Sequence, residues 1–207
     1  MAVVINGSGT VTGISVGGLP DGIVDSGTLA TNSVDSAELI DGAVDAAHLA
    51  SGVGGKVLQV VQTVKTDTAS HNGTSWSSAL MSASITPTST SNKILVMYSA
   101  TMVVSDASYE TYTSLWRDST QIFLADAAGS RGRSSGIVGR VDAYAGETLS
   151  QQYLDSPSST SSITYTFKAR SSGAGVYSYI NRGVTDRDDA NYDFRGASSL
   201  TLMEIGA

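Results

Sequence analysis

The stretch SITYTFKAR, residues 162–170, decides the fold class. Its apolar side chains Ile163, Tyr165, Phe167 and Ala169 alternate with polar ones along the chain. A period of two is typical of an antiparallel β-strand that buries one face. We therefore predict a strand here, and recurrence of the pattern along the chain makes the predicted fold all-β.

Similar runs occur throughout residues 56–207, separated by turn residues such as Asn72-Gly73 and Asp118-Ser119. They read KVLQVVQTVK (56–65), ALMSASIT (79–86), TYTSLWR (111–117), QIFLA (121–125), GIVGRVDAY (136–144) and SLTLMEI (199–205). No segment has the pattern of a long helix. Roughly eight to ten strands in about 150 residues predict an antiparallel β-sandwich of jelly-roll type.

The run KILVMYSATMVV, residues 93–104, is apolar on both faces. One face carries Ile94 and every second residue to Val104, and the opposite face carries Leu95, Met97 and Val103. Two packed sheets cover each other on one side only, so a doubly apolar strand needs further cover. We predict that Leu95, Met97 and Val103 lie at a subunit interface.

Composition excludes several classes of function. The chain has 207 residues, no Cys, 15% charged residues and a net charge of -7. Disulfides, thiolate zinc sites and cysteine nucleophiles are therefore excluded, and no basic footprint for nucleic acid is present. No apolar run approaches the ~20 residues needed to cross a bilayer, so we expect a protein made soluble in the cytosol without membrane insertion.

Residues 21–55 form an acidic segment with a ten-residue repeat, and the glycines of SGVGG, residues 51–55, mark a joint before the strands. Val and Leu recur every five residues, a spacing that scatters them around a helix instead of aligning them. Single helical turns stay possible, as does a disordered acidic linker. We favour a fibrous stalk in which identical neighbours cover Val24, Leu29, Val34, Leu39, Val44 and Leu49.

Catalytic and metal-binding patterns are weak. His48 and His71 are the chain's two histidines, and no GxSxG elbow accompanies the many serines. The loop TDRDDANYD, residues 185–193, clusters carboxylates but lacks the framework of a calcium loop, so we interpret it as a solvated acidic turn. We expect no enzyme activity, no metal and no cofactor.

Several stretches together resemble the fibre proteins of tailed bacteriophages. In the N-terminal part these are GTVTGISVGGLPDGIVDSGTLA and SAELIDGAVDAAHLASG, and in the C-terminal part GKVLQVVQTVKTDT, SLWRDSTQIF, LDSPSSTSSITYTFKARSS and SSLTLMEIGA. The resemblance implies a homotrimeric virion fibre, made in the host cytoplasm, with a β-sandwich head at residues 56–207. A stalk at 21–55 and a virion-attachment segment at 1–20, including Val3, Val4 and Ile5, complete the implied organisation.

Aromatic residues in turn-rich regions are the candidates for receptor contact, because aromatic faces suit carbohydrate or protein surfaces. They are Trp76, Tyr109, Tyr112, Tyr192 and Phe194, placed by this interpretation on head loops away from the stalk. Packing within the head or the trimer is the competing explanation for each. Two functions remain open: a fibre that attaches to a host-surface glycan or protein, and a structural fibre that decorates the capsid or tail.

Overall fold

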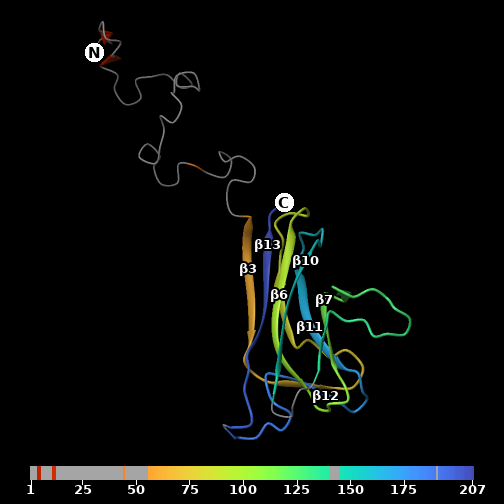
Figure 1. Ribbon diagram of the computed structural model, residues 1–207. Helices are drawn as coiled ribbons and strands as arrows, with labels where there is room; N and C mark the ends of the chain where they lie inside the picture. The colour runs from red at the N-terminus through yellow and green to blue at the C-terminus, as the bar shows by residue number, and fades with distance from the viewer. Residues whose placement is uncertain (1–3, 6–10, 13–43, 45–55, 140–144, 190) are drawn as a thin grey trace. The chain divides into compact units, whose positions relative to one another are not determined.

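The computed structural model describes residues 4–5, 11–12, 44, 56–139, 145–189 and 191–207 (Figure 1). Contacts divide the chain into two units, Met1–Gly54 and Gly55–Ala207. In the first unit, β1 (Val4–Ile5) pairs antiparallel with β2 (Val11–Thr12). The division adjoins the predicted joint at 51–55, and the finer division of the chain into three segments stays a prediction.

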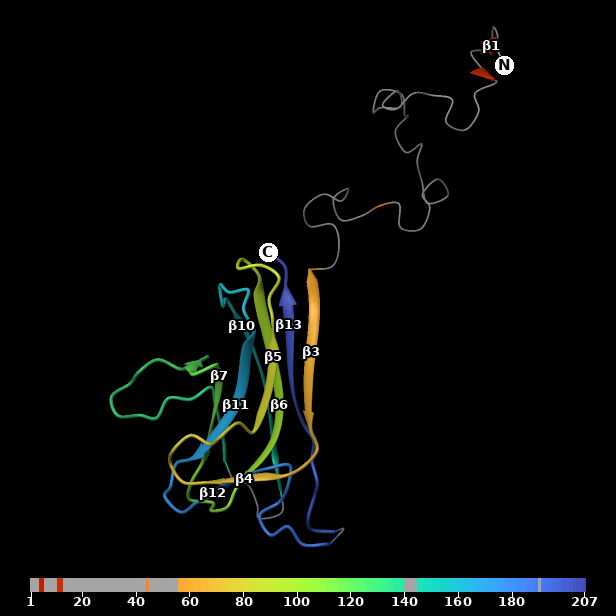
Figure 2. The ribbon, with the colours of Figure 1, turned by 180° about the vertical axis from the view of Figure 1, so that it is seen from behind.

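The second unit consists of two antiparallel sheets, which confirms the all-β class. The first sheet contains β3 (Val57–Lys65), β4 (Ala69–Asn72), β6 (Lys93–Val104), β10 (Glu147–Asp155), β12 (Tyr177–Ile180) and β13 (Ser198–Ile205). The second contains β5 (Met81–Ile85), β7 (Thr111–Arg117), β8 (Thr120–Ile122), β9 (Gly136–Val138) and β11 (Ile163–Ser171). Strands of the second sheet are seen best from behind (Figure 2).

Strand β6 organises the first sheet because it is long enough to pair with three neighbours. One edge pairs with β10 from Ile94 to Met102, and the other pairs first with β13 and then with β12. The resulting order is β3-β13-β6-β12-β4, with β10 on the opposite side of β6. In the second sheet the order is β5-β11-β7-β8, and β9 also pairs with β7.

The core lies between the two sheets, where the predicted apolar faces of β6 and β11 meet. Tyr165 and Phe167 of β11 are fully buried, as are Ile94, Val96 and Met102 of β6. The ring centroids of Tyr98 and Phe167 lie 5.0 Å apart across the sheets. Alternation therefore predicted the buried side of both strands correctly.

Three strands of the described head were not predicted: β4, β10 and β12. In β10 the inward positions are Leu149, Gln151, Tyr153 and Asp155, so polar residues interrupt the apolar alternation. Gln151 is accommodated because its Oε1 accepts a hydrogen bond from the Tyr98 hydroxyl. The two sheets agree with the predicted sandwich, while its jelly-roll type and the trimeric state stay predictions.

Side-chain hydrogen bonds join the two sheets along both sides. Thr63 Oγ1 donates to the Ser82 carbonyl at 2.8 Å, which joins β3 to β5. On the other side Arg117 donates to both oxygens of Asp155, at 3.0 and 2.9 Å, joining β7 to β10. The Tyr165 hydroxyl donates to the same carboxylate at 2.6 Å. The buried Asp155 is thus paired as well as hydrogen-bonded, which buried charges require.

Glu204 of β13 is a fully buried carboxylate near the end of the chain. Its Oε1 accepts hydrogen bonds from the Thr88 amide and Asn92 Nδ2, both at 2.6 Å, and Oε2 accepts one from Gln59 Nε2 at 2.6 Å. Burial alone would raise the pKa of Glu204, but these hydrogen bonds outweigh burial and lower the pKa to about 2. The charged side chain joins β13 to β3 and to the turn before β6.

Candidate functional site

The outward side of the first sheet forms what we call the uncharged face. We include in it fifteen outward residues of β3, β13, β6 and β10, namely Val60, Gln62, Val64, Ser199, Thr201, Met203, Ile205, Leu95, Met97, Ser99, Thr101, Thr148, Ser150, Gln152 and Leu154. None of these residues carries a charge. The one charged outward residue of these four strands is Lys93, which pairs with Ile205 at the end of the face, and the rows from Leu95 to Thr101 hold no Lys, Arg, Asp or Glu.

Strand register arranges the uncharged face in rows that run across the sheet. One row is wholly apolar and consists of Val60, Met203, Leu95 and Leu154. Val60 and Leu154, at its two ends, are 55% and 47% exposed. The next row contains Gln62, Thr201, Met97 and Gln152, and the one after it contains Val64, Ser199, Ser99 and Ser150. Within the described part of the chain, this apolar row is a continuous band that stays partly exposed.

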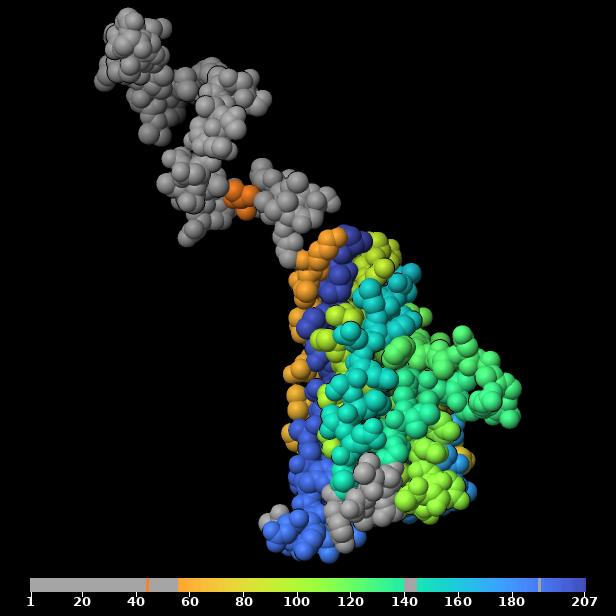
Figure 3. Space-filling view, viewed as in Figure 1, coloured from red at the N-terminus to blue at the C-terminus, as the bar shows by residue number. Residues whose placement is uncertain are grey.

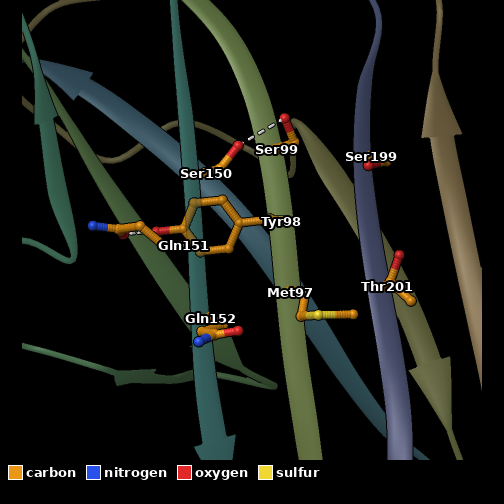
Figure 4. Close-up of a pocket in the computed structure, with 8 residues that line it drawn as sticks. All are labelled: Met97, Tyr98, Ser99, Ser150, Gln151, Gln152, Ser199 and Thr201. Atoms are coloured by element: carbon orange, nitrogen blue, oxygen red, sulfur yellow. Dashed lines mark hydrogen bonds between the residues drawn. The ribbon is translucent and has the colours of Figure 1, made fainter.

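Small side chains leave a hollow of about 460 Å³ beside these rows (Figure 4). Its lining is Met97, Tyr98, Ser99, Ser150, Gln151, Gln152, Ser199 and Thr201. Ser150 donates a hydrogen bond to Ser99 at 3.1 Å, and the Met97 side chain extends from β6 toward Thr201 of β13. The lining holds no titratable acid or base other than Tyr98, so it favours packing over catalysis.

The residues predicted for the subunit interface divide into three groups. Leu95 and Met97 are half-buried on the uncharged face, as the prediction requires. Val103 is only 1% exposed within the single chain, because alternation ends at Met102 and three consecutive residues of β6 are buried. The need for a second chain to cover Val103 was therefore wrong. Val44 is 42% exposed, and the other five repeat residues lie outside the described residues.

The N-terminal residues predicted for virion attachment are only partly described. Val4 and Ile5 form β1, whereas Val3 lies outside the described residues. Their role stays a prediction.

The outward side of the second sheet carries a different group, which we call the aromatic face: Trp76, Tyr112, Trp116, Lys168 and Arg170. Register places Arg170 of β11 opposite Tyr112 of β7, and Lys168 opposite Ser114. Alternation turns their neighbours Phe167 and Leu115 into the core. The same strands that build the core thus present rings and cations on their outer side.

Trp76 reaches the aromatic face from the segment between β4 and β5. That segment runs along β11: the Ser77 amide donates to the Ala169 carbonyl at 2.9 Å, and the Leu80 amide donates to the Phe167 carbonyl at 3.0 Å. Ser77 Oγ also accepts a hydrogen bond from the Ala169 amide at 3.1 Å. These bonds fix the backbone that follows Trp76.

Rings and cations alternate across the aromatic face. The Lys168 ammonium lies 4.3 Å from the centroid of the Trp116 ring. The Arg170 guanidinium lies 4.5 Å from the Tyr112 ring and 5.2 Å from the Trp76 ring. The two indoles meet edge to face, with centroids 6.5 Å apart. Each such cation–π contact contributes roughly 0.5–1 kcal/mol at a surface.

The loop that follows β8 lies against the aromatic face and projects from the described head (Figure 3). A Cβ on Gly132 would lie 2.8 Å from an Arg170 Nη2 atom and 3.5 Å from the Tyr112 ring. Arg131 and Arg133, on either side of Gly132, are exposed. The loop therefore brings further positive charge close to Arg170.

Electrostatically the aromatic face is unbalanced. Among the described residues, neither Lys168 nor Arg170 forms an ion pair, and Arg170 donates one hydrogen bond, to the Thr74 carbonyl at 3.4 Å. The buried indole nitrogen of Trp116 has no hydrogen-bond partner in the structure. The aromatic face thus holds Lys168 and Arg170, which have no carboxylate partner among the described residues, beside the unsatisfied indole N–H of Trp116.

The structure brings two of the five predicted receptor-contact residues together, Trp76 and Tyr112. Tyr112 lies in β7 and not in a turn. Tyr109 packs against Gly173, and Tyr192 and Phe194 lie in the loop that connects β12 and β13. For these three residues, receptor contact stays a prediction.

Trp116, Lys168 and Arg170 were missed as site residues. Alternation in SITYTFKAR directs Lys168 and Arg170 away from the core, whereas the pattern of TYTSLWR does not decide the side of Trp116. The available signal for a site was the pair of outward cations in SITYTFKAR. The prediction instead selected aromatic residues because they lie near turns.

The acidic loop predicted as a solvated turn contains internal ion pairs. Asp186 pairs with Arg182 at 3.1 Å and with Arg195, and Asp193 pairs with Arg187 at 2.8 Å. The hydrogen bond from Arg195 lowers the pKa of Asp186. Within the described residues, no group of three His, Asp or Glu side chains could hold a metal ion.

Comparison with known proteins adds no family to this description. No family model matches the sequence, and a search of curated proteins finds no match. In the part of the chain that the structure describes, no helix is suitable for crossing a membrane.

Proposed function

We propose that this chain is a homotrimeric bacteriophage virion fibre whose C-terminal head contributes to attachment to the host surface. The second candidate is a structural fibre that decorates the capsid or tail without binding a receptor. Both functions need a stable assembly of identical chains. The observation that carries the proposal is the apolar row of the uncharged face.

Absence of charge on that face supports self-association. Identical copies placed around a rotation axis bring the same surfaces together, so a charged residue near the axis would meet its own copies. The uncharged face avoids this repulsion. Covering a half-exposed Leu, Val or Met contributes about 1 kcal/mol per side chain, and the row offers four in each chain.

The order of the rows supports a parallel arrangement. When the axis runs along the strands, each row meets the same row of its neighbours. Leu95 then packs with other apolar side chains, while Gln62 and Gln152 meet polar partners. If two copies of the chain packed antiparallel, the apolar row of one copy would face a polar row of the other, unless the symmetry axis passed through the apolar row itself. Parallel chains also send every N-terminus in one direction, as a fibre needs.

The sequence supports the remaining parts of the proposal. Resemblance to phage fibre proteins spans both the N-terminal repeat and the head. The virion protein that receives residues 1–20 is not identified by this chain. In this proposal residues 21–55 act as a spacer, and the fibre is located in the virion.

Light scattering on the full chain tests the assembly. We expect three times the chain mass of 21.3 kDa at micromolar concentration. Three chains bury the apolar row, whereas a single chain leaves it in water. A stable monomer would contradict the proposal in both of its forms.

Deletion of residues 1–20 tests the attachment segment. We expect the shortened chain to remain trimeric, because the head lies in residues 56–207, and to be absent from purified phage particles. Particles grown with the shortened chain are probed with an antibody to the head. Normal incorporation would overturn the assignment of Val3, Val4 and Ile5.

Competition with phage adsorption separates the two candidate functions. A receptor-binding trimer added to host cells in excess should slow adsorption of the phage. A trimer that never competes, on a particle that adsorbs normally without the chain, leaves the decorating role.

A further inference from the structure

We propose that the aromatic face binds an acidic carbohydrate, with sugar rings on its aromatic side chains and sugar carboxylates on Lys168 and Arg170. This inference deepens the proposed attachment function and rests on it only for the biological source of the ligand. The ligand class is a glycan that contains uronic acid or a similar carboxylated sugar.

The rings supply a stacking surface of suitable size. Trp76 and Trp116 meet at an interplanar angle of 75°, so their rings cannot form one flat sheet, and a ligand would follow a stepped surface. Aromatic side chains give large contact area at low cost in conformational entropy. Hydrogen bonds from the Ser77 and Leu80 amides hold the segment that carries Trp76, which preorganises the stack.

The cations decide that the ligand is acidic. The Arg170 guanidinium lies over the rings of Tyr112 and Trp76, and one of its N–H groups donates to the Thr74 carbonyl at 3.4 Å, which leaves the others for an anion. Carboxylates at the ends of the two strands are already engaged: Asp118 accepts the Thr164 amide at 2.9 Å, and Glu110 accepts the Ser172 hydroxyl at 2.9 Å. Among the described residues, Arg170 has no acidic partner, so a ligand carboxylate would be its first.

The unsatisfied indole of Trp116 is the second independent observation. A buried donor without an acceptor is unfavourable, and a ligand oxygen would relieve it. This atom becomes reachable only after a neighbouring side chain moves. Lys168 lies over the same ring on a flexible four-carbon stem, so it can shift toward a carboxylate while uncovering the indole.

Single-stranded nucleic acid also combines stacking with anion binding, but the charge of the head does not favour it. Binding to a phosphate backbone needs a groove that neutralises successive charges. Apart from Lys168 and Arg170, the outward positions of β7 and β11 hold Thr, Ser and aromatic residues. Lys168 and Arg170, with Arg131 and Arg133 in one adjoining loop, form a small cluster and not a continuous basic groove, which matches the sparse charge of an acidic glycan better.

The experiment uses the intact chain and its own fluorescence. The two tryptophans of the protein are Trp76 and Trp116, so the emission reports on the aromatic face alone. The probes are oligogalacturonate, hyaluronan oligosaccharides, the carboxyl-reduced form of oligogalacturonate and oligothymidylate. Each is titrated into the wild type and into two variants, Lys168→Gln/Arg170→Gln and the control Lys93→Gln, at the first residue of β6 in the other sheet.

We expect a saturable emission change with at least one carboxylated glycan. The carboxyl-reduced probe and the Lys168→Gln/Arg170→Gln variant should bind at least tenfold more weakly, because charge-assisted hydrogen bonds are lost. Lys93→Gln should bind as the wild type does. Thermal unfolding of each variant confirms that it is folded, and a second variant, Arg170→Lys, replaces any that is not, with an expected loss because a point charge cannot give the planar fork.

Three outcomes overturn the inference: no response to either carboxylated glycan, equal binding of the carboxyl-reduced probe, or tighter binding of oligothymidylate. The proposed fibre function fails separately. A protein that binds the glycan but is monomeric refutes the fibre and keeps the site, whereas a trimer that competes for adsorption without binding either glycan keeps the fibre and refutes the site.

Discussion

Leu95→Glu is expected to convert the trimer into a folded monomer. Leu95 lies in the middle of the apolar row, between Met203 and Leu154 in register. Burying an unpaired carboxylate costs several kcal/mol, and a rotation axis multiplies this by bringing three copies together. The fold should survive because the Leu95 side chain points outward, away from the core. Light scattering should show a threefold fall in mass, with unchanged far-UV circular dichroism.

Ile137→Glu is the matched control, since Ile137 is an apolar residue on the second sheet that is 50% exposed, close to the 47% of Leu154 in the apolar row. It should leave the trimer intact. Leu154→Glu, at the edge strand β10, gives a second test of the same row should Leu95→Glu fail to fold. Persistence of the trimer in folded forms of both variants would mean that the chains associate through another surface.

The structure confirms the predicted strands whose sequence pattern depends only on neighbouring residues. Alternation in SITYTFKAR depends only on which residues follow one another, so it gave the correct buried face of β11. It failed for β10, where Gln151 occupies an inward position. Tyr98, which satisfies Gln151, lies 53 residues away, and no local pattern announces such a partner.

In the candidate site, too, local sequence pattern predicted some features, and long-range strand pairing determined the others. Alternation in SITYTFKAR directs Lys168 and Arg170 outward, and this much could be predicted, whereas TYTSLWR does not alternate clearly enough to place Tyr112 and Trp116. Their meeting depends on β11 pairing with β7, and on the segment around Trp76 running along β11. Strand order is set by long-range pairing, so the sequence pattern predicts the side of a residue and not its neighbours.

The uncharged face was predictable in part from the sequence pattern of β6 and in part only from the strand register. Leu95 and Met97 were singled out because a strand apolar on two sides is visible in the sequence. Their continuation into Val60, Met203 and Leu154 appears only with the strand register. Val103 fell on the wrong side because β6 ends its alternation where it pairs with β12.

Glu204→Gln is expected to destabilise the head at neutral pH and to reduce its sensitivity to acid. In the wild type, Glu204 accepts hydrogen bonds from Gln59, Thr88 and Asn92. An amide keeps one acceptor oxygen but turns its NH2 group toward a donor. Leaving buried donors unsatisfied costs about 1–3 kcal/mol each, so we expect a loss of about 2–4 kcal/mol at pH 7.

The direction of the pH effect follows from the pKa of Glu204. The pKa is about 2 in the folded chain, against an ordinary value of 4.5. A lowered pKa stabilises the folded state above pH 4.5, and this contribution is lost as the pH falls from 4.5 toward 2. Asp186 and Asp193 have lowered pKa values as well, so the wild type should lose further stability in acid through them.

Urea unfolding between pH 7 and pH 2.5, at one protein concentration, separates these contributions. The difference in unfolding free energy between wild type and Glu204→Gln should shrink as the pH falls below 4.5, because the wild-type carboxylate then gains a proton and loses its advantage. Glu147→Gln, an exposed carboxylate on β10, is the control and should follow the wild type at every pH. A difference that stays constant with pH would mean that the pKa of Glu204 in the folded head equals its ordinary value, and that the hydrogen bonds from Gln59, Thr88 and Asn92 do not favour its charged form.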